Sequence, residues 1–164
     1  MFRIKADCNE EIEAKISQAD AYAWFSDTAN FVALLPNLES VTPERDGSLK
    51  WTIAADVPTL GVMRVPFRVS RHDAPPNRIE FVPALAERQN YLRCVATFAA
   101  LGPALTRVKI TQTVDLRRAE AKSLHVLAAV VGSARISAET QKQMSAKLRE
   151  FLQAARIRLE KASA

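Results

Sequence analysis

The chain has 164 residues and a mass of 18.2 kDa, the usual size of one domain with a single hydrophobic core. Its 48% hydrophobic and 25% charged residues are typical of a folded globular protein and exclude a disordered or collagen-like chain. The net charge of +5 comes from scattered lysines and arginines that form no basic block. We therefore expect no nucleic-acid partner.

The ends and the cysteines bear on the compartment. Residues 1–5 contain two basic side chains and no apolar run, and the apolar stretch 126–131 is too short to span a bilayer. Cys8 and Cys94 have no neighbouring cysteine or metal-ligand pattern, which is typical of buried thiols in a reducing compartment. We expect a cytoplasmic protein that folds as one domain over residues 1–164, as a monomer or homodimer, without metal or cofactor.

The first predicted elements are a strand and two short helices. Residues 10–16 alternate between apolar and charged side chains, the period-two pattern of a half-buried strand. Ser17 is a favourable N-cap, and the apolar spacing within residues 18–25 predicts a short helix behind it. A second helical turn is predicted over residues 31–36, where Pro36 ends it.

A meander of antiparallel strands is predicted between residues 38 and 116. Short alternating runs are separated by turn residues at 45–48, 58–61, 72–77 and 102–103, which indicates about five strands. Each strand has one apolar and one charged face, so the sheet is predicted to bury one side. The apolar faces carry Leu49, Trp51, Ile53, Ala55, Val57, Met63, Val65, Phe67, Val69, Leu92, Cys94, Ala96, Phe98, Val108, Ile110, Val114 and Leu116.

The C-terminal part of the sequence has helical periodicity. From Ser137 onward, apolar residues from Met144 to Leu159 recur at the spacing of one helix face, which predicts a long amphipathic helix of some six turns. The apolar octamer 124–131, ended by Gly132, is predicted to be helical and docked on the protein.

These elements predict an α+β fold with an internal cavity. Its six- or seven-stranded antiparallel sheet curves around the long C-terminal helix, and two short helices follow the first strand. Because a helix is only ~10 Å across, a twisted sheet of this width must curl around it and can leave apolar space. The residues predicted to line this cavity and bind a ligand are Trp51, Ile53, Met63, Val65, Phe67, Tyr91, Cys94, Phe98, Ile110, Gln112, Met144, Leu148 and Phe151.

The order of elements resembles the helix-grip fold of the START-like (SRPBCC) superfamily. Residues 16–31 and the Leu35-Pro36 pair are similar to that superfamily's passage from the first strand into its helices. Residues 35–41 are similar to a segment of the G-type subunit of carbon monoxide dehydrogenase. The superfamily includes birch-pollen-allergen-like proteins, polyketide cyclases and aromatases, and lipid-transfer domains. The resemblance implies that the chain binds or transports a hydrophobic small molecule or lipid.

Few side chains in the sequence indicate chemistry. His72 falls in an expected surface turn and His125 in the apolar octamer, and neither has a metal-ligand neighbour at helical spacing. No nucleotide-binding loop is present in the sequence. Gln112 interrupts an apolar strand face, so its amide either recognises a ligand or is satisfied by backbone or water. We assign no catalytic residue.

Three functions remain open at this level. The first and favoured one is a binding module for a hydrophobic molecule. The second is a cyclase- or aromatase-like enzyme that uses Gln112, Glu10 and Tyr91. It predicts an inward cluster of at least two of these residues, and finding all three on the solvent face would exclude it. The third is an adaptor that docks on a membrane surface or a partner protein through residues 124–131 and the C-terminal helix.

Overall fold

A computed structural model describes residues 1–57, 60–125 and 127–163 of the chain. Within them, a seven-stranded antiparallel sheet has the order β1-β7-β6-β5-β4-β3-β2. Its strands are β1 (Phe2–Ala14), β2 (Leu38–Pro43), β3 (Leu49–Val57), β4 (Gly61–Ala74), β5 (Arg78–Pro83), β6 (Asn90–Gly102) and β7 (Leu105–Arg118). The helices are α1 (Gln18–Ser26), α2 (Thr28–Leu34), α3 (Ala128–Val131) and α4 (Ser133–Ser163), with a 3₁₀ turn, η1 (Ala121–Ser123).

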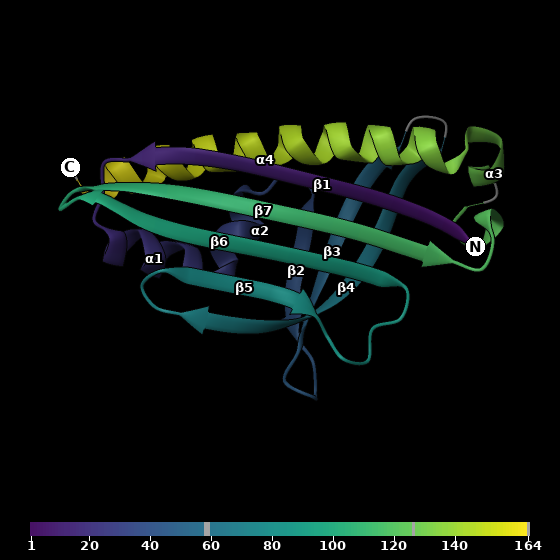
Figure 1. Ribbon diagram of the computed structural model, residues 1–164, viewed down its shortest axis with the longest axis horizontal. Helices are drawn as coiled ribbons and strands as arrows, with labels where there is room; N and C mark the ends of the chain where they lie inside the picture. The colour runs from purple at the N-terminus through teal and green to yellow at the C-terminus, as the bar shows by residue number, and fades with distance from the viewer. Residues whose placement is uncertain (58–59, 126, 164) are drawn as a thin grey trace.

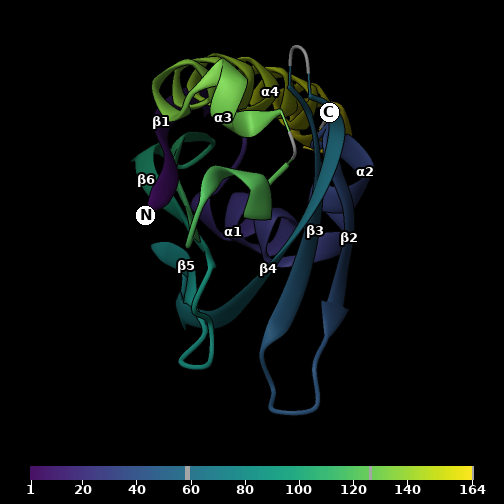
Figure 2. The same cartoon turned by 90° about the vertical axis from the view of Figure 1, so that its right-hand side faces the viewer.

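The sheet is strongly curved. In Figure 1, β1, β7 and β6 run along the long axis of the molecule, whereas β3 and β4 cross it steeply behind them. The view from the end in Figure 2 shows a trough, with α4 across its open side and α1 and α2 at its far end. The predicted α+β architecture, a curved antiparallel sheet around a long C-terminal helix, is confirmed.

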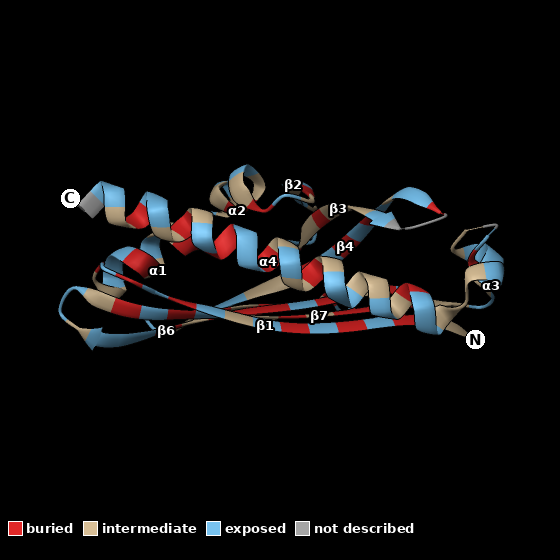
Figure 3. Ribbon diagram, turned by 90° about the horizontal axis from the view of Figure 1, so that it is seen from above, coloured by how far each residue is buried: buried red, intermediate tan, exposed pale blue. Residues whose placement is uncertain are grey.

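Alternating burial along the strands separates a core face from a solvent face. Ile4, Ala6 and Cys8 of β1 are buried between exposed neighbours, and Figure 3 shows this alternation along β1. The strand β1 therefore starts at Phe2, eight residues before the predicted one. After the helices the described chain forms six strands, one more than the count from the sequence, and the short β2 carries a register shift near its start.

The two short helices follow β1 as predicted. The Ser17 hydroxyl accepts a hydrogen bond from the Asp20 backbone N–H at 3.2 Å and caps α1. Asp27 caps the start of α2, because its carboxylate accepts a hydrogen bond from the Ala29 backbone N–H at 3.0 Å. The second helix therefore starts at Thr28 rather than near residue 31, and it ends before Pro36.

Helix α4 holds the free edge of β1. Its side chains Ser137 and Gln141 accept hydrogen bonds from the backbone N–H groups of Lys5 and Asp7, at 3.2 and 2.9 Å. These N–H groups point away from β7 and would otherwise lack a partner on the protein. The helix starts at Ser133, four residues before the predicted start, and so it covers the whole length of the trough.

An aromatic cluster fills the trough where α1 and α2 close it. Phe31 of α2 lies 4.9 Å from Phe151 of α4 and 5.8 Å from Trp51 of β3, between ring centroids. Such ring contacts add to the apolar area that the core buries. The members of this cluster are Trp24, Phe25, Phe31, Trp51, Phe81, Phe98 and Phe151.

One carboxylate on the outer face of the sheet is almost fully buried. Asp115 of β7 accepts hydrogen bonds from the guanidinium groups of Arg3, at 2.6 Å, and Arg117, at 2.8 Å. The bond from Arg3 is the main reason that the pKa of Asp115 falls to about 2. This ion pair links the ends of β1 and β7.

The segment before α4 is only partly docked. Leu124 and Val131 pack against the core and Ala128 is buried, but Val130 is 83% exposed and Leu127 40% exposed. The prediction of a docked helical octamer is thus correct for some of its residues, and Val126 lies outside the described part of the chain. No helix among the described residues is both long and apolar enough to cross a membrane.

The predicted turns are found where the structure describes them. Gly47 has a φ of +87°, which suits the turn expected at 45–48, and β6 and β7 are joined across residues 103–104. Pro58 and Thr59 of the expected turn at 58–61 lie outside the described residues. His72 is exposed, but it belongs to strand β4 rather than to a turn.

Candidate functional site: an apolar cavity under helix α4

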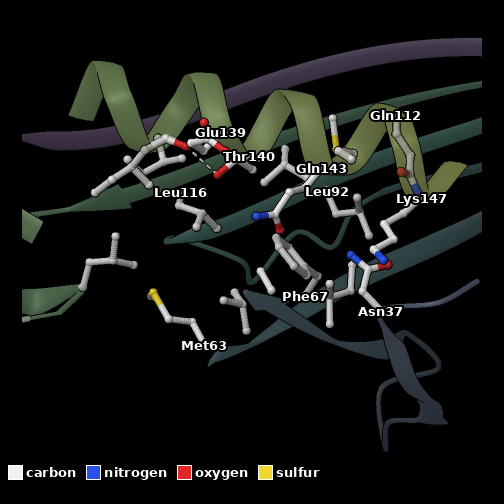
Figure 4. A pocket seen from close by; sticks show the side chains of 18 of the residues that line it. Asn37, Met63, Phe67, Leu92, Gln112, Leu116, Glu139, Thr140, Gln143 and Lys147 are labelled. Atoms are coloured by element: carbon white, nitrogen blue, oxygen red, sulfur yellow. Dashed lines mark hydrogen bonds between the residues drawn. The ribbon is translucent and has the colours of Figure 1, made fainter. Parts of the chain in front are cut away.

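A cavity of about 80 Å³ lies between helix α4 and the inner face of the sheet, next to the aromatic cluster. Every layer of the fold contributes to its wall, which Figure 4 shows from close by. The apolar wall residues are Ile4, Leu35, Ile53, Ala55, Met63, Val65, Phe67, Leu92, Val114, Leu116, Leu124, Ile136 and Met144. The polar ones are Asn37, Gln112, Glu139, Thr140, Gln143 and Lys147.

The cavity exists because the aromatic rings fill only one end of the trough. Toward η1 and α3 the sheet presents smaller side chains, such as Ala55, Val65 and Val114, and α4 presents unbranched Met144 and Gln143. Close packing is the rule in protein interiors, so an apolar space of this size is a specific feature of this end of the molecule.

Six of the thirteen residues predicted from the sequence to line a cavity lie on this wall. They are Ile53, Met63, Val65, Phe67, Gln112 and Met144. Trp51, Phe98 and Phe151 belong instead to the aromatic cluster, and Ile110 and Leu148 are buried in the core away from the wall. Cys94 is buried beside Gln112.

Tyr91 lies on the opposite face of the sheet from the cavity. The Arg117 guanidinium stacks over its ring, 4.4 Å from the centroid, in a shallow outer groove. Glu10 is half-buried and forms an ion pair with Arg149 of α4 at 3.0 Å, and it does not reach the cavity wall. Of the three polar residues that the enzyme hypothesis names, only Gln112 lies on this wall, so the inward cluster of at least two of them that it predicts is not formed.

Gln112 is the polar group most deeply enclosed in the site, with 5% of its surface exposed. It pairs across the sheet with Cys8 of β1 and Cys94 of β6, so a thiol flanks it on each side. Burial raises the pKa of Cys8 to about 11 and that of Cys94 to about 12, so both thiols are neutral near pH 7.

The amide of Gln112 has unused hydrogen-bonding capacity. Its Nε2 donates to Cys94 Sγ at 3.9 Å, a long bond to a weak acceptor. An amide has two N–H donors and one acceptor oxygen, and among the described residues no other side-chain hydrogen bond of Gln112 is found. A ligand with a polar atom in the cavity would therefore find a partner here.

Helix α4 supplies four of the six polar wall residues, Glu139, Thr140, Gln143 and Lys147, which the sequence pattern did not predict. Glu139, Gln143 and Lys147 follow one another at four-residue intervals, so they lie on one stripe of the helix, beside Met144. The amide of Gln143 also donates to the backbone carbonyl of Asp56 at the end of β3. This bond joins α4 to β3 across the seam where the cavity approaches the surface.

The wall contains two ionisable side chains among the described residues, Glu139 and Lys147. In the described chain, no group of three His, Cys, Asp or Glu side chains is arranged to hold a metal ion. The site thus combines a mainly apolar surface with amides and one charge of each sign.

Comparison with protein-family models gave no match, and comparison with curated protein sequences gave none either. Solved structures do match. The di-domain ARO/CYC BexL from the BE-7585A biosynthetic pathway is 19% identical with a TM-score of 0.65, over 96% of this chain and 50% of BexL. The shared fold is the helix-grip fold.

Two further structures have this helix-grip fold. TTHA0849 from Thermus thermophilus is 17% identical with a TM-score of 0.67, over 96% of this chain and 99% of that protein. A START superfamily protein from Mycobacterium smegmatis is 13% identical with a TM-score of 0.53, over 91% of this chain and 98% of that protein. The chain spans about half the length of BexL. At identities this low, the structural similarity shows a shared fold and nothing more specific.

Proposed function

We propose that this chain binds a small hydrophobic molecule in the cavity under α4. The observation that carries the proposal is an apolar space of about 80 Å³ that contains a buried, weakly bonded amide, that of Gln112. The helix-grip fold, in which a sheet curls around one helix, supports this function because it leaves such space between the layers.

An empty cavity of this kind lowers stability, and a ligand would offset that loss. At roughly 24 cal/mol per Å³, a space of 80 Å³ is equivalent to about 2 kcal/mol. A molecule that fills it regains dispersion contacts with Phe67, Leu92 and Val114 and removes its own apolar surface from water. Occupancy should therefore raise the free energy of unfolding.

The size of the cavity restricts the ligand. Pockets that enclose drug-sized molecules measure roughly 300 Å³ or more, so 80 Å³ holds only a short chain or one ring. A longer molecule has to extend through the seam between α4 and β3, where the hydrogen bond from Gln143 to Asp56 must open. We expect affinity to depend strongly on ligand length.

Thermal unfolding with a series of small amphiphiles and aromatics tests the proposal. With 1-octanol at 100 times its Kd, mass action stabilises the protein by about 2.7 kcal/mol, a rise in Tm of about 5–10 °C for a chain of this size. The series should include alkanols, ethylbenzene, quinones, sterols and an aromatic polyketide. No stabilisation by any of these compounds would refute the proposal.

A second candidate is a cyclase- or aromatase-like enzyme. The similarity to one half of the di-domain ARO/CYC BexL favours it. Such an enzyme would have to use Glu139, Lys147 and the amides of this wall, because Glu10 and Tyr91 lie elsewhere. Incubation with a linear poly-β-ketone, followed by mass spectrometry for the loss of water, tests this function. Equal rates with wild type and with Glu139→Gln, Lys147→Met would contradict it.

The third candidate is an adaptor that docks on a membrane or a partner protein, as the resemblance to the G-type subunit of carbon monoxide dehydrogenase implies. The exposed Val130 and Leu127, on the segment before α4, favour it. Sedimentation with liposomes, for wild type and for Val130→Asp, tests docking on a membrane. Equal sedimentation of the two proteins would remove this segment as the contact.

A further inference from the structure

The polar residues of the cavity are unevenly distributed. Lys147 points from α4 toward Asn37, on the same end of the cavity as Gln112, whereas Glu139 and Thr140 lie toward the other end (Figure 4). At a rise of 1.5 Å per residue, Glu139 is roughly 12 Å from Lys147 along the helix. One end of the cavity is thus positively charged and rich in N–H donors.

The three side chains at this end have spare hydrogen-bonding capacity. Asn37 lies between α2 and β2, and its backbone carbonyl accepts from Ala54 at 2.8 Å. Among the described residues, no hydrogen bond to the side chain of Asn37 and no ion pair of Lys147 is found. Within the described ranges, the side chain of Gln112 makes only its long bond to Cys94. These donors are available to a ligand.

No neighbouring acid in the described part of the chain forms an ion pair with Lys147. Glu150, the acid nearest to it along the helix, is exposed and faces away from the cavity wall. Lys147 itself is half-buried against apolar side chains, where solvent screens its charge less than on an open surface. Such a cation attracts an anion that also has an apolar part.

We propose that the ligand carries a carboxylate, which binds between Lys147, Asn37 and Gln112. A carboxylate has two acceptor oxygens, which suit one ammonium group and the N–H groups of the two amides. The apolar part then runs along Phe67 and Leu92 toward the other end of the cavity. This inference rests on the proposed function, since it names the ligand class of the same cavity.

Isothermal titration with sodium octanoate and with 1-octanol at pH 7.5 tests the inference. The two compounds share a chain and differ in the charge of the head group. Lys147→Met keeps most of the side-chain stem and removes the ammonium. Lys142→Met, an exposed lysine on the same helix, is the matched control. Octyl phosphate is included to distinguish a carboxylate from a phosphate ester.

We expect wild type to bind octanoate more tightly than octanol. Lys147→Met should weaken octanoate binding about tenfold and change octanol binding less than twofold, because a charge-assisted hydrogen bond is lost only with the anion. Lys142→Met should change neither. If octanol binds and Lys147→Met leaves octanoate binding unchanged, or if octyl phosphate binds far better, the inference is wrong and the proposed function stands. If neither octanoate nor octanol binds but an uncharged compound such as ethylbenzene does, the inference is wrong and the proposed function stands. If none of the compounds binds, both are wrong.

Discussion

Filling the cavity should separate ligand binding from stability. Ala55 of β3 lies on the cavity wall and is half-buried, and Ala55→Leu adds three carbon atoms that point into the space. Full burial of three carbons would contribute about 2.4 kcal/mol at about 0.8 kcal/mol each. Since the position is half-buried and some strain is expected, we predict a net gain of about 1 kcal/mol, a rise in Tm of about 2–4 °C.

The same substitution should abolish binding, because the added side chain occupies the ligand's space. We expect the Tm increase caused by 1-octanol to fall from about 5–10 °C to less than about 2 °C. Ala54→Leu is the matched control, because its side chain lies on the outer face of the same strand. It should leave the octanol effect intact.

Two results would refute this reasoning. A loss of more than about 2 kcal/mol in Ala55→Leu would mean that the space is not free to accept three carbons. Undiminished octanol binding in a folded Ala55→Leu protein would mean that the ligand binds elsewhere. Differential scanning fluorimetry and chemical unfolding, with and without octanol, measure both quantities.

Three further substitutions test separate parts of the structure. Asp115→Asn should lower the free energy of unfolding by about 1–2 kcal/mol at pH 7. Because the pKa of Asp115 in the folded protein, about 2, is below the ordinary 3.8, this difference from wild type should disappear as the pH falls from about 4 to 2. A difference that does not depend on pH would contradict this. Gln112→Leu should keep or slightly raise the free energy of unfolding, and it should weaken octanol binding about tenfold relative to ethylbenzene binding. An unchanged ratio of the two affinities would mean that the amide has a purely structural role. Gln143→Ala should speed octanol dissociation about fivefold in NMR exchange measurements, since the hydrogen bond across the seam between α4 and β3 is lost. An unchanged dissociation rate would mean that the ligand does not leave through this seam.

The sequence pattern predicted much of the sheet because burial on one face leaves a period-two signal. The alternation of apolar and charged residues around Trp51, Phe67 and Phe98 predicted three strands, which the structure contains as β3, β4 and β6. The start of β1 was missed because Ala6 and Cys8 are small and give a weak apolar signal between charged neighbours. The predicted meander began at residue 38, but neither β2 nor β5 was given an apolar face of its own, because each has only six residues and β2 also contains a register shift.

The position of the cavity could not be predicted from the strand pattern. Alternation indicates which side chains face inward, but it does not show which of them meet the aromatic rings of Phe25 and Phe31. Those contacts place Trp51 and Phe151 in the packed end of the trough. Which end stays open depends on where the two short helices dock, and this is a tertiary contact that the sequence pattern does not encode.

The polar wall from α4 had a detectable signal. Glu139, Gln143 and Lys147 are spaced like one helix stripe, directly beside the apolar stripe that contains Met144. The sequence does not show which flank of an amphipathic helix turns toward the sheet. The flank is set here by the hydrogen bonds of Ser137 and Gln141 to β1, which fix the rotation of the helix about its axis.

NMR of the methionine methyl groups tests the binding of a hydrophobic ligand in this cavity most directly. The chain has three methionines: Met63 and Met144 line the cavity, and Met1 is 84% exposed at the N-terminus. During titration with 1-octanol, the methyl signals of Met63 and Met144 should shift together and saturate, while that of Met1 stays in place. Saturable binding that leaves the Met63 and Met144 signals unchanged would contradict the account.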